Sequence, residues 1–425
     1  MHDFLIGRLV RDFRGRARLV GMGGLLLLAL LRATAAEWRY DLTKLAPTQA
    51  FSNERGFGFD LGTTPTKEGK PFFFSVAVPE GNYRVTVTIG DPLAATTTTI
   101  KAESRQLLLA QIATRPGESV TREFVVNVRN RLLPPPEKNA PGGSSVLLNE
   151  RETGNLRWDD KLTLEFNGTA PQVSSLVIEP VVVPTVFLAG DSTVTDQPFE
   201  PGASWGQMLP RFLPGVAVAN HAESGETLKS FISGLRLAKI LSQAKAGDYL
   251  FIQFGHNDEK KNWPQTYVEA HTTYEAYLRV FIAEARLRGV TPVLVTSMQR
   301  RNFDEHGRIK NTHGDYPQAV REVAAAEHVA LIDLERMSVA FYEALGPGNA
   351  PLAFSAGGRD ATHHDNYGAY ELAKCVVQAV RDAGLPLARS IAADFTGFDP
   401  AHPDAPEAFT LPPSPQRSEV RPRGN

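Results

Sequence analysis

Hydrophobic residues follow two different patterns along the chain, and the pattern changes near residue 180. From residue 37 to residue 180, apolar residues alternate with polar ones or form short runs that end at Gly, Pro or Asn. The segment from Phe72 to Gly90 is typical, with two such runs separated by the turn sequence PEGN. Alternation with period two, interrupted by turn residues, predicts short β-strands. We therefore predict a β-sandwich over residues 37–180.

After Pro184, short apolar runs alternate with longer segments that have helical periodicity. Five runs have strand character: Thr185–Gly190, Val216–Asn220, Asp248–Gly255, Thr291–Met298 and Ala330–Leu334. Apolar strands that alternate with helices predict an α/β fold, with a mostly parallel sheet covered on both faces. We assign this domain to residues 185–390. The Pro-rich, polar residues 391–425 are expected to lie across the surface or to be disordered.

The first 36 residues have the order of a secretory signal peptide. Five arginines between Arg8 and Arg18 precede the apolar run Gly21–Leu31, and the small-residue sequence ATA follows. This order is typical of a cleaved export signal, and the apolar run is too short to span a bilayer. We predict that residues 1–36 are removed and that the mature protein is periplasmic or secreted, without a membrane anchor. A retained anchor or a buried helix is the alternative.

Composition and charge exclude some classes of partner. Hydrophobic residues make up 42% of the 425 residues and charged residues 22%, as in a globular protein with a sizeable core. The formal net charge is −2, so no electrostatic footprint for nucleic acid or an anionic membrane is present. Cys375 is the single cysteine, which excludes an intrachain disulfide. Because it lies in an apolar helical run, we interpret it as a packing residue.

Three short polar stretches directly follow predicted strands, and a fourth comes later, after the last predicted strand. They are GDS (Gly190–Ser192), NHAESG (Asn220–Gly225), GHND (Gly255–Asp258) and DATHH (Asp360–His364), the last of which opens the final helix. A GDS turn by itself is usually a turn whose Asp or Ser caps a helix. In an open parallel sheet, however, ligands bind beyond the carboxyl ends of the strands. Because all four stretches fall at that edge, together they indicate a functional site.

The residue types at this edge suit hydrolysis of an ester. Ser192 would be the nucleophile and His363 its base. Asp360 precedes His363 by one helical turn, from where its carboxylate can reach Nδ1 and leave Nε2 free to take the serine proton. The backbone N–H groups of Ser192 and Gly225 and the side-chain amide of Asn257 could stabilise the oxyanion.

Other residues near this edge are candidates for substrate contact. His256 could contact a sugar, help to place Asn257 or simply pack within its loop. Trp263 and Trp205 lie near the predicted rim and could stack on sugar rings, although helix packing explains Trp205 equally well. The basic loop over residues 299–315 could contact an anionic polymer or be a solvated loop.

Three further interpretations of single residues remain to be weighed. His364 is the alternative base, although its spacing from Asp360 is one residue longer. Asp360, His363, His364 and Asp365 could suggest a metal, but adjacent histidines at a helix start point apart and no further ligand cluster completes a site. We therefore expect neither a metal nor another cofactor. Asn167 begins a glycosylation sequon, which does not by itself establish a glycan.

The four stretches resemble a known family. GDS, the glycine of NHAESG, GHND and DATH resemble, in order, the four conserved blocks of the SGNH (GDSL-type) hydrolases. The surrounding sequences FLAGDSTVTD, SWGQMLPRF, QFGHND and THHDNYGAYELA resemble more narrowly the rhamnogalacturonan acetylesterases of pectin degradation. The resemblance covers roughly Thr185 to Gly384.

This resemblance implies an SGNH-hydrolase-like (flavodoxin-like) three-layer α/β/α domain with a five-stranded parallel sheet. It implies removal of O-acetyl groups from rhamnogalacturonan without a metal, with the nucleophile, oxyanion donors and acid–base pair at the residues named above. The substrate would be an acetylated plant cell-wall polysaccharide or oligosaccharide. Residues 37–180 resemble, more loosely, a galactose-binding-like module, which we expect to support or extend the cleft. The alternatives are an acetylxylan esterase, another GDSL-type esterase or lipase, or a non-catalytic carbohydrate-binding protein.

Overall fold

The computed structural model describes residues 36–66 and 69–418, so the predicted signal peptide lies outside the described residues apart from Ala36.

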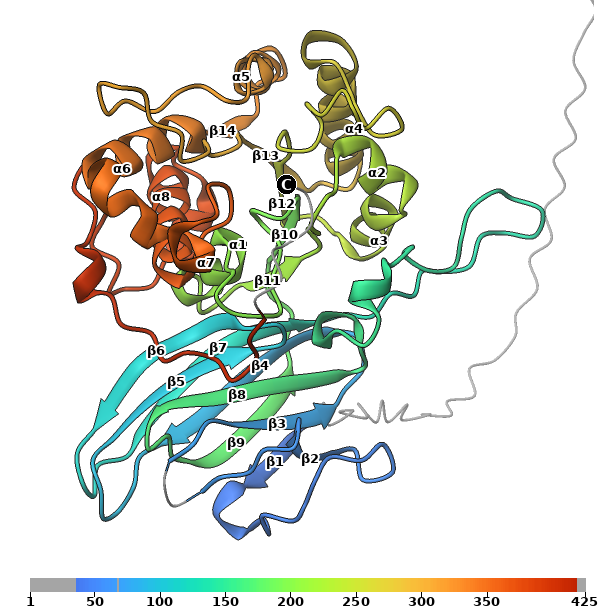
Figure 1. Ribbon diagram of the computed structural model, residues 1–425. Helices are drawn as coiled ribbons and strands as arrows, with labels where there is room; N and C mark the ends of the chain where they lie inside the picture. Colours follow the sequence, from blue (N-terminus) through green and yellow to red (C-terminus); the bar gives the residue numbers. More distant parts are fainter. Residues whose placement is uncertain (1–35, 67–68, 419–425) are drawn as a thin grey trace, which may run out of the picture. The chain divides into compact units, whose positions relative to one another are not determined.

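The N-terminal half holds two antiparallel sheets (Figure 1). One has the strand order β1 (Trp38–Asp41), β9 (Val173–Pro180), β4 (Gly81–Ile89), β7 (Val120–Val128). The other has the order β2 (Phe57–Asp60), β3 (Phe72–Ala77), β8 (Lys161–Thr169), β5 (Thr96–Ala102), β6 (Gln106–Thr114).

The two antiparallel sheets share one hydrophobic core. Along β4, Val85 and Val87 are buried, whereas Arg84 between Tyr83 and Val85 is exposed. The buried side chains pack against Phe74 of β3 in the opposite sheet, within a single cluster. The alternation in the sequence therefore arises because one face of each strand points into this core. The predicted sandwich fold is confirmed, and its resemblance to a galactose-binding-like module stays a prediction.

The C-terminal half is built on a parallel sheet of five strands. Their order is β11 (Ala217–Asn220), β10 (Thr185–Gly190), β12 (Tyr249–Gln253), β13 (Thr291–Val295), β14 (Ala330–Ile332). Every neighbouring pair is parallel, and each strand lies within one of the five predicted segments. The chain leaves β10 for β11 on one side and later returns to β12 on the other. Such a reversal opens a crevice at the carboxyl end of the sheet, where ligands bind in folds of this kind.

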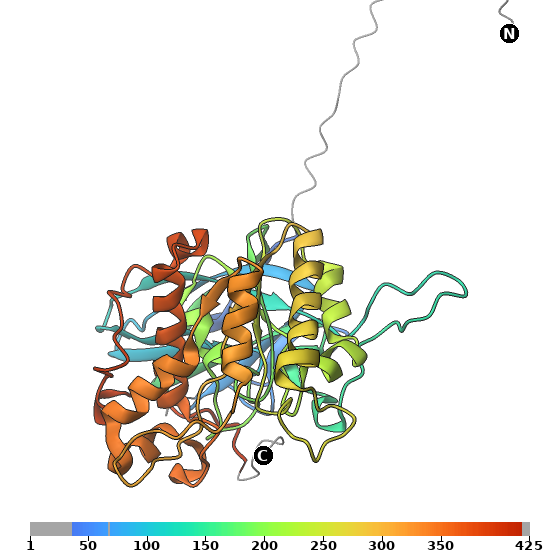
Figure 2. The same cartoon turned by 90° about the horizontal axis from the view of Figure 1, so that it is seen from above.

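Helices cover both faces of the parallel sheet. The longer ones are α2 (Leu228–Ser233), α3 (Arg236–Gln243), α4 (Glu275–Leu287), α5 (Tyr316–Ala326), α6 (Leu334–Asn349) and α8 (Asn366–Asp382). The shorter helical segments are η1 (Leu42–Lys44), η2 (Glu150–Glu152), η3 (Leu156–Trp158), α1 (Trp205–Met208), η4 (Leu209–Phe212), η5 (Ala270–Tyr274), η6 (Ala350–Ala353), α7 (Ser355–Gly358), η7 (Pro386–Ser390) and η8 (Pro406–Ala408). Figure 2 shows the long helices, coloured yellow to red, running beside one another. None of the helices among the described residues is long and apolar enough to cross a membrane.

Successive residues of β10 pack into different helix layers. Val186 and Leu188 belong to a cluster with α1, α6 and α8, whereas Phe187 and Ala189 belong to a cluster with α2, α3, α4 and α5. A strand buried on both faces has no polar face, which is why its sequence is continuously apolar. This arrangement confirms the three-layer α/β/α fold.

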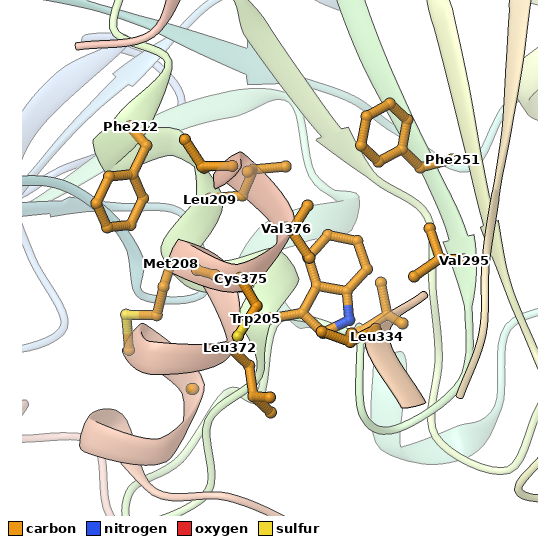
Figure 3. Packing of buried hydrophobic residues seen from close by; sticks show 14 of the residues in the cluster. Trp205, Met208, Leu209, Phe212, Phe251, Val295, Leu334, Leu372, Cys375 and Val376 are labelled. Carbon is orange, nitrogen blue, oxygen red and sulfur yellow. The ribbon is translucent and has the colours of Figure 1, made fainter. Parts of the chain in front are cut away.

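The cluster with α1, α6 and α8 contains two residues for which the sequence analysis made predictions, Trp205 and Cys375. Figure 3 shows Trp205 and Cys375 side by side among apolar side chains, including Leu372 and Val376. Trp205 is 1% exposed and its Nε1 donates to Oε1 of Gln253 at 2.8 Å, so it packs in the core and is not available for sugar stacking. Cys375 is fully buried, and burial raises the pKa of its thiol. It is a packing residue, as predicted.

The C-terminal tail runs over the sandwich as far as it is described. Lys101 Nζ donates to Pro412 O at 3.2 Å, and Ser414 Oγ donates to Glu165 Oε2 at 2.7 Å. Asn167 Nδ2 donates to Pro413 O at 2.9 Å, and Asn167 is only 2% exposed. The sequon thus lies in the buried interior of β8, where a glycan cannot be accommodated.

Candidate active site

The turn that carries Ser192 is fixed by its own hydrogen bonds. Asp191 Oδ1 accepts from the backbone N–H of Thr193 at 2.9 Å and from its hydroxyl at 2.7 Å. Gln197 Nε2 donates to Ser192 O at 2.8 Å. A Cβ at Gly190 would lie 2.6 Å from Val194 Cγ2, so only glycine lets the strand end pack this closely. The turn therefore holds the Ser192 hydroxyl in a defined place at the carboxyl end of β10.

The side chains of Ser192, His363 and Asp360 form one hydrogen-bonded chain. His363 Nε2 lies 2.9 Å from Ser192 Oγ, and His363 Nδ1 lies 2.9 Å from Asp360 Oδ2. All three residues are at most 2% exposed. In this arrangement the imidazole can accept the serine proton at Nε2 while Nδ1–H donates to the carboxylate.

The surroundings of Asp360 keep its carboxylate ionised. Its Oδ1 accepts from the backbone N–H groups of Thr362 at 2.8 Å and His363 at 3.0 Å. Burial by itself raises the pKa of Asp360, but the hydrogen bond and charge of His363 and the two N–H groups outweigh burial and lower that pKa below its ordinary value. An ionised carboxylate at this position stabilises the imidazolium that forms when His363 takes a proton.

The two predicted oxyanion donors other than Ser192 lie in two loops that contact each other. Asn257 is fully buried, and its Nδ2 donates to Glu226 O at 3.0 Å, which leaves the second amide N–H for an acceptor in the site. Gly225 has φ of +85°, a conformation that side-chain-bearing residues rarely adopt. Among the described residues, apart from its two chain neighbours, no heavy atom lies within 4 Å of the place where its Cβ would be, so this side of Gly225 faces open space.

The two predicted substrate-contact residues have different environments. His256 is 2% exposed, with Nδ1 3.5 Å from Asp191 Oδ2 and its ring edge-on to His313 at 4.4 Å between centroids. Burial and the neighbouring His313 charge lower the pKa of His256 to about 4, so its ring is neutral. These contacts favour a role in holding the GHND loop. Trp263 is half-buried, with Lys260 Nζ 4.2 Å from its ring centroid, and its contact with a sugar stays a prediction.

The alternative base and the metal interpretation do not fit the geometry. His364 Nε2 lies 2.7 Å from Tyr342 Oη in the core, and burial lowers the pKa of His364 to about 3. Asp365 caps α8 by accepting from Gly368 N at 3.0 Å. Asp360 and His363 are bonded to each other, whereas His364 and Asp365 have other partners, so the four side chains do not converge on one point.

Within the described ranges, the His, Asp and Glu side chains that come close enough to share an ion lie elsewhere. They are His271 of η5, Glu275 of α4 and Glu322 of α5.

The structure gives structural roles near the site to Lys260 and to two residues of the basic loop. The sequence did not predict these roles. Lys260 Nζ donates to Asn257 Oδ1 at 3.1 Å and so orients the amide, and the three-residue spacing between them was the available signal. Arg300 of the basic loop donates to Glu259 Oε1 at 2.7 Å, and Arg301 donates to Gly358 O at 2.6 Å. Both guanidinium groups hold loops around the site, and that of Arg300 is paired with a carboxylate.

Comparisons with known proteins identify the family of the chain. Residues 188–372 match the GDSL-like Lipase/Acylhydrolase family. Rhamnogalacturonan acetylesterase RhgT of Bacillus subtilis (strain 168) is 43% identical over 216 residues, covering 48% of this chain and 91% of the relative. The chain belongs to the GDSL-like lipase/acylhydrolase family. As a member of this family, it is a hydrolase that acts on carboxylic esters.

Two other matches extend the comparison. The probable rhamnogalacturonan acetylesterase YesY of the same Bacillus subtilis strain is 42% identical over 212 residues, covering 48% of this chain and 96% of the relative. The crystal structure of the Bacillus subtilis protein YxiM is 23% identical with a TM-score of 0.47, covering 83% of this chain and 99% of that one.

Proposed function

We propose that this GDSL-like hydrolase is a carbohydrate esterase that removes O-acetyl groups from rhamnogalacturonan by a Ser-His-Asp mechanism. The observation that carries the proposal is the chain of 2.9 Å contacts from Asp360 through His363 to Ser192. The choice of substrate is supported by the 43% identity to a relative named rhamnogalacturonan acetylesterase.

In the first half of the reaction, Ser192 Oγ attacks the acetyl carbonyl while His363 Nε2 takes the hydroxyl proton. The carbonyl π electrons move to oxygen, and that oxyanion accepts from Ser192 N–H, Gly225 N–H and Asn257 Nδ2–H. When the tetrahedral intermediate collapses, the bond from the acetyl carbon to the sugar oxygen breaks. The imidazolium gives its proton to the leaving sugar oxygen as this bond breaks, so the sugar departs with a free hydroxyl group.

In the second half, a water molecule replaces the sugar. His363 removes one proton from the water as its oxygen attacks the acetyl-Ser192 carbonyl. The second tetrahedral intermediate breaks the bond to Ser192 Oγ and releases acetic acid, and His363 returns its proton to the serine. Asp360 stays ionised throughout and stabilises the imidazolium in both halves.

The proposal is tested by acetate release from the purified chain. Acetylated rhamnogalacturonan should release acetate, the same polymer saponified beforehand should not, and Ser192→Ala should lower kcat by at least about 10³-fold. Unchanged turnover in Ser192→Ala would contradict the mechanism. Faster acetate release from acetylated xylan, or faster hydrolysis of octanoyl than acetyl esters, would assign a different substrate within the family.

We also propose that the protein acts outside the cytoplasm, because residues 1–36 have the order of an export signal. Expression of the full chain in a Gram-negative host, followed by fractionation and N-terminal sequencing, tests this. A mature chain that begins near residue 37 in the periplasm or medium is expected. A full-length chain in the cytoplasm would contradict export.

A further inference from the structure

A segment of the sandwich half contacts the loop that carries Gly225. We call residues 221–226 the oxyanion loop, and the sandwich segment of η2 and η3, residues 150–158, the bracing segment. Arg157 of the bracing segment donates through Nη2 to the Glu223 carboxylate and through Nη1 to Ala222 O at 3.4 Å. Its Nη1 also donates to Thr195 Oγ1. Arg157 thus ties the oxyanion loop to the turn that follows Ser192.

Arg151 holds the same loop one residue before Gly225. Its Nε donates to Glu223 Oε1 at 2.8 Å, and its Nη2 donates to Ser224 O. Both carboxylate oxygens of Glu223 are therefore bound by arginines of the sandwich half. Arg157 is 3% exposed and Glu223 2% exposed. Removing one partner of such a buried pair strongly destabilises the fold, because the other charge is left buried and unpaired. The pair therefore holds the loop in one position.

A second connection reaches Asn257 independently of Glu223. Glu152 of the bracing segment accepts from Arg236 Nη2 at 2.5 Å, and Arg236 Nε donates to Glu226 Oε1 at 3.2 Å. The backbone oxygen of Glu226 accepts from Asn257 Nδ2 at 3.0 Å. Both non-serine oxyanion donors are thus linked, through buried charged side chains, to the bracing segment.

We infer that Arg151 and Arg157 are positioning residues of the esterase, through which the N-terminal sandwich sets the oxyanion loop in its catalytic geometry. This inference rests on the proposed function, because it assigns Gly225 N–H and Asn257 Nδ2 to the oxyanion. It makes the sandwich a part of the catalytic site rather than a separate binding module. The energetic basis is that an error of about 1 Å in placing such a group costs up to about 10²-fold in rate.

The test compares Arg157→Met and Arg151→Gln with the matched control Lys239→Met in the full chain. Lys239 is also a buried cation that joins the two halves, because its Nζ contacts Glu80 Oε1 at 2.7 Å and Leu132 O at 2.6 Å. Among the described residues, its hydrogen bonds and ion pairs reach neither the oxyanion loop nor the GHND loop. Lys239→Met therefore measures the effect on kcat of weakening the contact between the two halves without removing a hydrogen bond to the oxyanion loop.

The expected result is a fall in kcat without a comparable rise in KM. On a small acetyl ester, Arg157→Met should lower kcat about 10- to 100-fold and Arg151→Gln about 3- to 10-fold, with KM within about twofold. The rate at which a fluorophosphonate labels Ser192 should fall in parallel, because the phosphoryl oxygen occupies the oxyanion position. Lys239→Met should change both readouts by less than about twofold, whatever its effect on Tm.

Two results would overturn the inference: kcat within twofold of wild type in both arginine variants, or an equal loss in Lys239→Met. If Arg157→Met does not fold, Arg151→Gln decides the outcome, because 32% of the Arg151 side chain is exposed and its loss is tolerated more easily. If the wild type hydrolyses no acetyl ester, the proposed function fails, and the labelling rate still tests the inference. Labelling slowed only in the arginine variants supports it, and equal labelling contradicts it.

Discussion

Ser192 Oγ and His363 Nε2 lie 2.9 Å apart, although 171 residues separate them along the chain. Ser192 follows β10, an inner strand of the parallel sheet, and His363 lies three residues before the start of α8, which packs against one face of the same sheet. The parallel sheet therefore brings the hydroxyl and the imidazole to one edge. Because both groups are nearly buried, the contact forms in an environment where charge interactions are stronger than in water.

The charge of the Asp360 carboxylate, and not only its shape, should be needed for catalysis. Asp360→Asn is expected to lower kcat by about 10³- to 10⁴-fold, because an amide N–H facing Nδ1 stabilises the tautomer whose Nε2 cannot accept the Ser192 proton. Steady-state kinetics on a small acetyl ester measure the effect. His364→Gln is the control, since its ring contacts Tyr342 in the core, and it should keep kcat within about threefold of wild type. A greater loss in His364→Gln than in Asp360→Asn would reverse the assignment of the base.

Lys260 should act through the amide of Asn257. Lys260→Met removes the ammonium group that donates to Asn257 Oδ1, so the amide is held less firmly and kcat should fall about 3- to 10-fold. An uncharged acetyl ester is the appropriate substrate, because it separates this effect from attraction of an acidic polymer. Lys261→Met, at the exposed neighbouring position, is the matched control and should leave kcat unchanged. Equal kinetics for both variants would show that Asn257 needs no such support.

Trp263 should contribute to binding of polymer and not to chemistry. Its partly exposed ring is expected to stack on a sugar, so Trp263→Ala should raise KM for acetylated rhamnogalacturonan about 3- to 10-fold. The kcat on a small acetyl ester, which has no sugar to stack on the ring, should stay within about twofold of wild type. The two substrates are compared in one assay of acetate release. An equal loss on both would indicate that Trp263 supports the loop instead.

The buried His364 should make the protein less stable in acid. Its pKa is lowered from 6.5 to about 3 in the fold, so between these values the unfolded chain binds a proton that the folded chain does not. Between pH 7 and pH 5 this group alone should therefore lower the free energy of unfolding by about 2 kcal/mol. Denaturant unfolding of His364→Gln at both pH values should show a smaller decrease than the wild type. His306→Gln, at an exposed position, should behave like the wild type, and parallel curves for all three proteins would contradict this contribution.

The local sequence determined the elements of the hydrolase half and the chemistry at their ends. A strand such as β10 is buried on both faces, so its run of apolar residues predicted it directly. The polar stretches after the strands marked one edge of the sheet because all carboxyl ends of parallel strands meet there. Ser192 could be named from the sequence for this reason. Asp360 and His363 lie between α7 and α8, and they could be named from their spacing and from the resemblance to the SGNH hydrolases.

Contacts between segments far apart in the chain were decided only by the tertiary structure. The side chain of Trp205 lies in the core, Asn167 is covered by the C-terminal tail, and Arg300 turns inward to Glu259. Arg157 lies 66 residues before Glu223, and no periodicity or motif in the sequence relates them. A pattern of apolar and polar residues indicates the environment of a residue only through the residues close to it in sequence. Which buried charges meet depends on how the sandwich and the parallel sheet pack, and that packing is a property of the whole fold.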